Sequence, residues 1–275
     1  MNSNTVGRPA PAWERGTASE VGGRREQQDR WGMFELPQQD GLLALLADGM
    51  GGHLDGAMGA QIVVEEARKL AHNPTTLLRT DPLAALNQLC WDMHAAINRQ
   101  SENARSTVVV LWLQGDQGYW LNVGDSRLYH FRDGRRLMRT RDHSAVQLLM
   151  DMGEIDESEM ATHPAQNRLY RSLGGEERPQ PDVGQITIQS GDLLALCSDG
   201  VWEHVSEEEL WESAQTGAAA AAPLLAARAT QRGGASADNA TLLLLRATDT
   251  LPRRRRSWWQ RLLGDTGDLQ RSERS

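Results

Sequence analysis

Residues 42–49 read LLALLADG, and residues 193–200 read LLALCSDG. Each stretch begins with an apolar run of the length of one buried strand and ends in aspartate followed by glycine. The strand fixes the position of the aspartate, and the glycine lets the backbone turn and expose its carbonyl beside the carboxylate. The near repeat therefore predicts two buried strands that deliver Asp48 and Asp199 to strand ends.

Two further aspartates lie beside predicted strands. Asp125 follows an apolar run at 119–123, and Asp238 precedes one at 241–245. A single Asp-Gly pair after a strand is ordinary turn chemistry, but four strand-edge aspartates form a set of oxygen ligands that suits Mg²⁺ or Mn²⁺. Two such ions can share a bridging hydroxide placed for in-line attack on phosphorus. The residues alone suggest metal-assisted hydrolysis of a phosphate ester.

The remaining pattern is a mixture of strands and helices. Further strands are predicted at 31–36, 107–113, 128–131 and 186–188, and helices at 56–72, 82–100, 145–152, 207–214 and 223–232. Short turns at 115–118 and 132–135 join neighbouring strands and imply antiparallel pairing. The alanine run at 218–222 connects or extends the last two helices. We expect an α+β fold with antiparallel sheets.

Composition limits the class of protein. The chain has 275 residues, and 39% of them are hydrophobic, which is enough for a buried core. No stretch approaches the ~18 apolar residues of a membrane span, and the N-terminus lacks an apolar secretory segment. The two cysteines are too few for a disulfide or zinc framework. We expect a cytoplasmic monomer with a flexible arm at 1–15, one domain at 16–250 and a tail at 251–275.

Charge is unevenly distributed along the chain. The formal net charge is −8, yet residues 252–275 hold seven arginines against three acidic residues, so the rest of the chain carries −12. An acidic body argues against nucleic-acid binding, which needs basic surface. The tail combines the arginines at 253–256 with Trp258, Trp259 and two leucines. It is either a contact for an anionic membrane or acidic partner, or a short disordered extension.

A series of short motifs follows in order along residues 19–246. They are RREQQD at 24–29, DGMGGHLDG at 48–56, ST at 106–107, GDSR at 124–127, DHS at 142–144, HP at 163–164 with Asn167, SLG at 172–174, GD at 191–192, SDG at 198–200, and DN at 238–239 with Thr241. Together they resemble the metal-dependent Ser/Thr protein phosphatases, the PPM or type 2C family, in its compact bacterial branch.

The resemblance implies a fold and an activity. The implied fold is a central sandwich of two antiparallel β-sheets flanked by α-helices, in four αββα layers, with a metal site at one edge and a flap at about 142–175. The implied activity is hydrolysis of phosphoserine and phosphothreonine on proteins. It would use two Mn²⁺ or Mg²⁺ ions, with a third, more labile ion in bacterial relatives. The partners would be phosphorylated proteins and an opposing bacterial Ser/Thr kinase.

Matching motif positions imply roles for particular residues. Asp48 would bridge two ions, and the Gly49 carbonyl would bind one of them. Asp199 and Asp238 would complete the other site, and Asp125 would hold the third ion together with Asp199.

The first motif, RREQQD at 24–29, implies two further roles. Arg24 would bind the substrate phosphate, a role that suits its bidentate fork. The motif often ends Glu-Asp in the family and here reads Gln28-Asp29, so Asp29 would serve alone, either as a ligand or as support for the ligands. A histidine proposed as leaving-group acid in eukaryotic relatives is replaced by Met50, which leaves that proton to a metal-bound water.

One alternative of a different class stays open at this point. A chain with this fold could bind phosphoproteins as a regulatory module with weak catalysis. Loss of the ligand aspartates would favour that alternative, but Asp48, Asp199 and Asp238 are all present.

Overall fold

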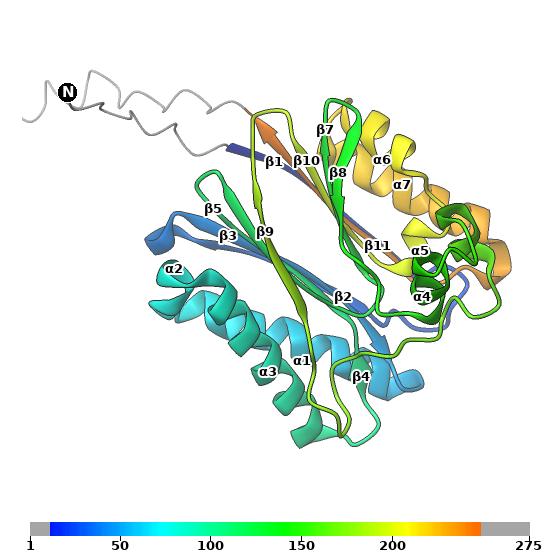
Figure 1. Cartoon of the computed structure of the whole chain (residues 1–275), viewed down its shortest axis with the longest axis horizontal. Helices are drawn as coiled ribbons and strands as arrows, with labels where there is room; N and C mark the ends of the chain where they lie inside the picture. Colours follow the sequence, from blue (N-terminus) through cyan, green and yellow to red (C-terminus); the bar gives the residue numbers. More distant parts are fainter. Residues whose placement is uncertain (1–11, 249–275) are drawn as a thin grey trace, which may run out of the picture.

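The computed structural model describes residues 12–248, which form two packed antiparallel sheets between two layers of helices (Figure 1). The first sheet has the order β1 (Ala12–Glu20), β11 (Ala240–Thr248), β10 (Leu193–Cys197), β7 (Arg127–Arg132), β8 (Arg135–Arg139). The second has the order β2 (Asp29–Leu36), β3 (Gly41–Met50), β5 (Val108–Gln114), β6 (Gln117–Val123), β9 (Asp182–Thr187), and the short β4 (Arg105–Ser106) pairs with β3. The expected α+β sandwich is confirmed.

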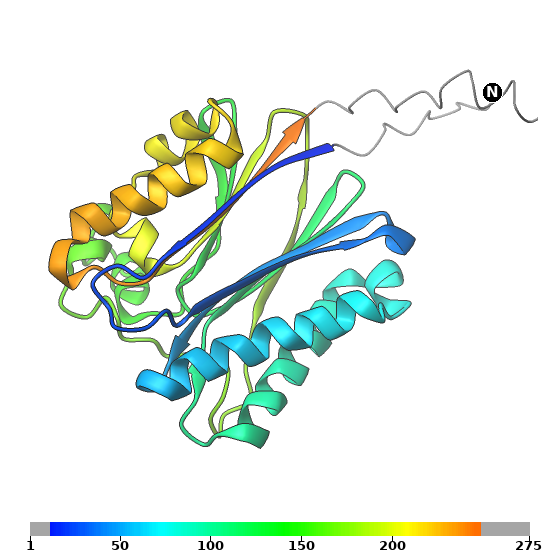
Figure 2. The same ribbon diagram turned by 180° about the vertical axis from the view of Figure 1, so that it is seen from behind.

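Helices cover the outer face of each sheet. The second sheet is covered by α1 (His53–His72) and α3 (Pro82–Gln100), with the short α2 (Leu77–Thr80) between them. The first is covered by α5 (Asp199–Trp202), α6 (Glu207–Ala214) and α7 (Ala218–Gly233), and Figure 2 shows α7 lying along β1. Residues 142–175, the flap that the resemblance implies, contain α4 (Ala145–Asp151) and a 3-10 turn at Glu157–Thr162.

The two repeated stretches are buried on both faces. In β3, Leu42 and Leu46 face the core between the sheets, whereas Leu43 and Leu45 face the core under α1 and α3. The residues of β10 alternate in the same way between the central core and the core under α5–α7. A strand enclosed on both faces reads as a continuous apolar run, which explains why these two stretches stand out in the sequence.

Two sequence predictions are corrected, and the alternative left open for the alanine run is decided. Residues 12–15 belong to β1 and pair with β11, so the arm predicted at 1–15 was too long. The alanine run extends α7, which begins at Ala218 with Pro223 inside its first turns. The strand predicted at 186–188 overlaps the end of β9, which begins at Asp182 and ends at Thr187, so Ile188 lies outside it.

The terminal arm and the basic tail predicted from the sequence fall mostly or wholly beyond residues 12–248. Residues 1–11 and 249–275, which include the basic tail, are outside the described residues. Within residues 12–248, the helices are too short or too polar for any of them to cross a membrane.

A buried ion-pair network joins β7 to the turn before β10, and it gives a stability prediction. His130 Nε2 lies 2.8 Å from Asp192 Oδ2, and Arg132 Nε donates to Asp192 Oδ1 at 2.7 Å. Burial opposes ionisation, but the hydrogen bonds from Arg132 and His130 lower the pKa of Asp192 to about 2. We expect Asp192→Asn to lower the free energy of unfolding by about 2 kcal/mol at pH 7, the scale of hydrogen bonds to a charged group.

The pH dependence of this difference follows from the sign of the shift. A carboxyl whose pKa is lowered in the fold stabilises it above the unfolded value near 4, and this contribution is lost as the pH falls towards 2. Urea unfolding of wild type and Asp192→Asn should therefore give curves that converge between pH 4 and the lowest pH at which the fold survives. Asp116→Asn, in an exposed turn, is the control; equal loss in both variants would contradict the prediction.

Candidate metal centre

One end of the sandwich gathers the five predicted aspartates. Asp29 begins β2 and is the register partner of Asp48 near the end of β3. Asp125 lies in the turn between β6 and β7, and Asp199 begins α5 directly after β10. Asp238 lies two residues before β11. Elements of both sheets thus bring these carboxylates to the same end of the sandwich.

The carboxylates are close enough to change one another's ionisation. Burial, followed by the charges of Asp199 and Asp29, holds the pKa of Asp48 well above its usual range. Burial and Asp199 do the same to the pKa of Asp125. Burial and Asp238 raise the pKa of Asp199 to about 7. The carboxyl groups here outnumber the arginines that act on them and resist ionisation together, which is the electrostatic setting that a cation relieves.

Backbone geometry fixes Asp48 and its glycine. The Asp48 backbone N–H donates to Thr107 Oγ1 at 3.0 Å, and that hydroxyl lies 2.8 Å from Ser126 Oγ, next to Asp125. A Cβ on Gly49 would lie 1.9 Å from the Gly56 carbonyl oxygen. Only glycine allows α1 to approach β3 so closely. Since β3 continues through Gly49 to Met50, the glycine at this position serves packing and not the turn predicted from the sequence.

Asp29 carries an orphaned oxygen, which tests whether this donor set fits a metal. Ser198 Oγ donates to Asp29 Oδ2 at 2.8 Å, whereas Oδ1 is buried with no hydrogen-bond partner among the described residues. Burial, opposed by hydroxyl hydrogen bonds and reinforced by Asp199, raises the pKa of Asp29 to about 8. A buried carboxylate oxygen without a donor is costly, and a hard divalent cation that takes oxygen ligands would satisfy it. The residues fit such an ion.

The side chains are not in a coordinating arrangement. Across residues 12–248, no three His, Cys, Asp and Glu side chains form a group that could hold an ion. Asp238 is instead paired with Arg24, whose Nη2 donates to Asp238 Oδ2 at 2.6 Å. That hydrogen bond, and then the charge of Asp238, raises the pKa of Arg24. The five carboxylates therefore lie close enough to repel one another, but they are not arranged around a common point. Their role as metal ligands stays a prediction.

The chain is similar to proteins of known activity. The sequence model of the protein phosphatase 2C family matches residues 15–232. The chain belongs to the protein phosphatase 2C family. The serine/threonine phosphatase stp of Listeria monocytogenes is 31% identical over 196 residues, which cover 69% of this chain and 77% of the relative.

Solved structures agree with this membership of the 2C phosphatase family. The crystal structure of the Mycobacterium tuberculosis serine/threonine phosphatase PstP/Ppp matches with a TM-score of 0.75 at 30% identity, covering 86% of this chain and 99% of that one. A PstP catalytic domain in complex with two manganese ions matches with a TM-score of 0.74 at 28% identity, over 86% and 99% of the two chains.

Sequence reasoning missed one acidic residue of this 2C phosphatase site. Glu203 lies four residues after Asp199 and directly follows α5 as its C-cap, so about one helical turn separates them. Burial and the charges of Asp199 and Asp238 raise the pKa of Glu203 to about 8. The spacing of four residues between Asp199 and Glu203 was the available signal in the sequence. It places the two side chains near each other only if the segment is helical, and the four-residue helix α5 was not predicted.

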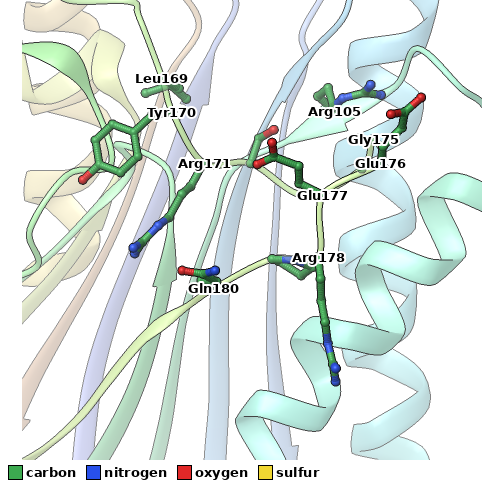
Figure 3. Close-up of a pocket in the computed structure, with 12 residues that line it drawn as sticks. Arg105, Leu169, Tyr170, Arg171, Gly175, Glu176, Glu177, Arg178 and Gln180 are labelled. Atoms are coloured by element: carbon green, nitrogen blue, oxygen red, sulfur yellow. The ribbon is translucent and has the colours of Figure 1, made fainter.

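A separate pocket lies at the C-terminal end of the predicted flap of this 2C phosphatase. It has a volume of about 320 Å³ and is lined by Arg105 and residues from 169–180. Figure 3 shows that Arg105, Arg171 and Arg178 point in different directions, and Glu177 lies in the same pocket. The arginines do not converge on one point, and none of the predicted aspartates lines this pocket. The candidate centre is therefore distinct from it.

Proposed function

We propose that this chain hydrolyses phosphoserine and phosphothreonine on proteins in a metal-dependent reaction. The observation that carries the proposal is the cluster of five carboxylates at one end of the sandwich, with a half-exposed arginine at its rim. Membership of the protein phosphatase 2C family and the named serine/threonine phosphatases among its relatives support the same reaction.

The carboxylates would hold the metal. Asp48, the Gly49 carbonyl, Asp199 and Asp238 are the proposed ligands of two Mn²⁺ or Mg²⁺ ions. Asp125 and Asp199 would hold a third, and Asp29 contributes its unpaired oxygen as a ligand or as support. The two manganese ions of the related PstP domain support this assignment. When bound, the ions would activate water as a nucleophile and neutralise charge on the phosphoryl group.

Arg24 would bind and orient the phosphate. Its guanidinium lies at the rim of the carboxylate cluster, and its side chain is 56% exposed. The planar fork can donate to two phosphate oxygens at once, and its present partner, Asp238, would then be free to bind metal. Arg24 would thus offset part of the negative charge of the carboxylate cluster before substrate binds, and it would bind the phosphate afterwards.

The partners and the compartment follow from the same reaction. The substrates are phosphorylated proteins, and a bacterial Ser/Thr kinase would add the phosphates that this enzyme removes. We propose a monomer that acts in the cytoplasm. Membrane contact through the basic tail concerns residues outside the described range and stays a prediction from sequence.

The test is phosphate release from a phosphothreonine peptide. We expect turnover with Mn²⁺, none after chelation by EDTA, and recovery when Mn²⁺ is restored, because the acidic cluster needs a cation to bind an anionic substrate. A phosphotyrosine peptide serves as the comparison substrate. Wild-type protein that binds the phosphothreonine peptide with Mn²⁺ but releases no phosphate would refute hydrolysis and support the regulatory binding module.

A further inference from the structure

A buried arginine joins the flap to the loop that carries Asp125. Arg127 begins β7, and its side chain is 6% exposed. Its Nε and Nη2 donate to both carboxylate oxygens of Asp142, the shortest contact being 2.7 Å, and its Nη1 donates to the Tyr129 hydroxyl at 3.0 Å. Asp142 is fully buried at the start of the flap. A bidentate pair without solvent holds both side chains in one geometry, so this end of the flap is fixed to β7.

A flat face of the same guanidinium packs on the ring of Trp202. The Arg127 Cζ lies 3.6 Å from the ring centroid of Trp202, the last residue of α5. The Trp202 indole N–H donates to the Asp125 backbone carbonyl at 3.0 Å, in a buried bond. Since Asp199 begins the same four-residue helix, this one N–H bonds the element that carries Asp199 to the loop that carries Asp125.

The flap also contacts the Asp125 loop from its other side. The His143 backbone N–H donates to the Gly124 carbonyl at 2.8 Å, and the Gly124 N–H donates to His143 Nδ1 at 3.1 Å. Gly124 has φ +106°, a conformation that glycine adopts readily. The loop is therefore held on one side by Trp202 and on the other by the second residue of the flap.

We propose that Trp202 and Arg127 are positioning residues that set the spacing between Asp125 and Asp199 and couple that spacing to the flap. The inference rests on the proposed function, because it assumes that the two aspartates act on one cation. Neither residue touches the metal or the substrate. Trp202 fixes the Asp125 backbone through its N–H, and Arg127 orients the indole and ties it to Asp142.

Coupling of this kind is reciprocal. If a cation between Asp125 and Asp199 holds the loop and α5 together, it also stabilises the Trp202–Arg127–Asp142 chain and with it the start of the flap. Hydrogen exchange of flap amides in 142–175 should then slow when Mn²⁺ is added. This readout measures the flap directly and needs no turnover.

The decisive variant is Trp202→Phe, which keeps an aromatic ring under Arg127 and removes only the N–H donor and part of the ring. We expect about 10-fold weaker Mn²⁺ binding by titration calorimetry, the lower end of the range for residues that support metal ligands. We expect a similar loss in kcat at limiting Mn²⁺, with the peptide KM within about twofold of wild type. Mn²⁺ should no longer slow flap exchange.

Trp211→Phe is the matched control, since Trp211 lies on α6 beside the Gly134 turn and packs against the same apolar core as Trp202. It should behave as wild type in all three measurements. Arg127→Lys keeps the charge but loses the fork and the flat face. In Arg127→Lys, Mn²⁺ should likewise slow the hydrogen exchange of the amides in 142–175 less than it does in wild type. Thermal unfolding verifies that this variant is folded.

The outcomes separate this inference from the proposed function. Wild-type Mn²⁺ affinity and wild-type flap response in a folded Trp202→Phe variant would overturn the positioning role. A wild-type protein that binds Mn²⁺ but releases no phosphate would overturn hydrolysis, and calorimetry and exchange would still decide the positioning role.

Discussion

We expect Asp199→Asn to lower kcat on a phosphothreonine peptide by more than about 100-fold in the presence of Mn²⁺. Asp199 is a proposed ligand of two of the three ions, the one that it would hold with Asp238 and the third one that it would hold with Asp125. It is also the neighbour whose charge acts most on Asp48 and Asp125. Substituting residues that merely support ligands costs about 10–100-fold, so removal of a shared ligand should exceed that range. The measurement is phosphate release against Mn²⁺ concentration for both proteins.

The same substitution should stabilise the metal-free protein. Since burial and Asp238 raise the pKa of Asp199 to about 7, its ionised form is disfavoured in the fold. This penalty is fully present above pH 7 and disappears as the pH falls towards 4, the unfolded value. In EDTA, Asp199→Asn should therefore melt above wild type at pH 8, and the difference should shrink at pH 5.

Asp133→Asn provides the control for this pair of effects. Asp133 lies in the β7–β8 turn with φ 50°, which asparagine tolerates, and it is exposed. It should leave both activity and melting temperature unchanged. A folded Asp199→Asn protein with full wild-type turnover would refute the ligand assignment, whereas lost turnover together with a lower metal-free melting temperature would indicate a structural role instead.

The burial of a strand decides whether it can be predicted from the sequence. Strands such as β3 and β10 are buried on both faces, so their apolar runs are continuous and easily recognised. The edge strands β1 and β8 are different, because each has a neighbour on one side only. β8 consists of Arg135–Arg139 and is largely exposed, and neither polar pattern predicts a strand without its partner.

The site shows the same division between local and long-range information. Asp48 and Asp199 were predictable because each comes at the end of a continuous apolar run, Asp48 within β3 and Asp199 just after β10. The register that places Asp29 opposite Asp48 could not be deduced, since it depends on how β2 pairs with β3. Trp202 gave no signal at all, because its role depends on a guanidinium 75 positions earlier in the chain and on a backbone carbonyl in a different loop.

We expect Arg24→Ala to raise the peptide KM by about 10–100-fold, with a smaller change in kcat. A bidentate guanidinium–phosphate contact is a charge-assisted pair of hydrogen bonds, and losing about 1.5–3 kcal/mol of binding corresponds to that range. The guanidinium is half-exposed at the rim, so its loss should change the free energy of unfolding by less than about 1 kcal/mol. Steady-state kinetics at saturating Mn²⁺ measure the effect.

Two further variants distinguish phosphate binding from charge alone. Arg24→Lys keeps the positive charge but loses the fork, so it should recover only part of the affinity. Arg25→Ala removes an equal charge from the adjacent exposed position and should leave KM within about twofold of wild type. If Arg24→Ala and Arg25→Ala raised KM equally, the effect would come from general electrostatic attraction, because only Arg24 is paired with the carboxylate cluster through Asp238.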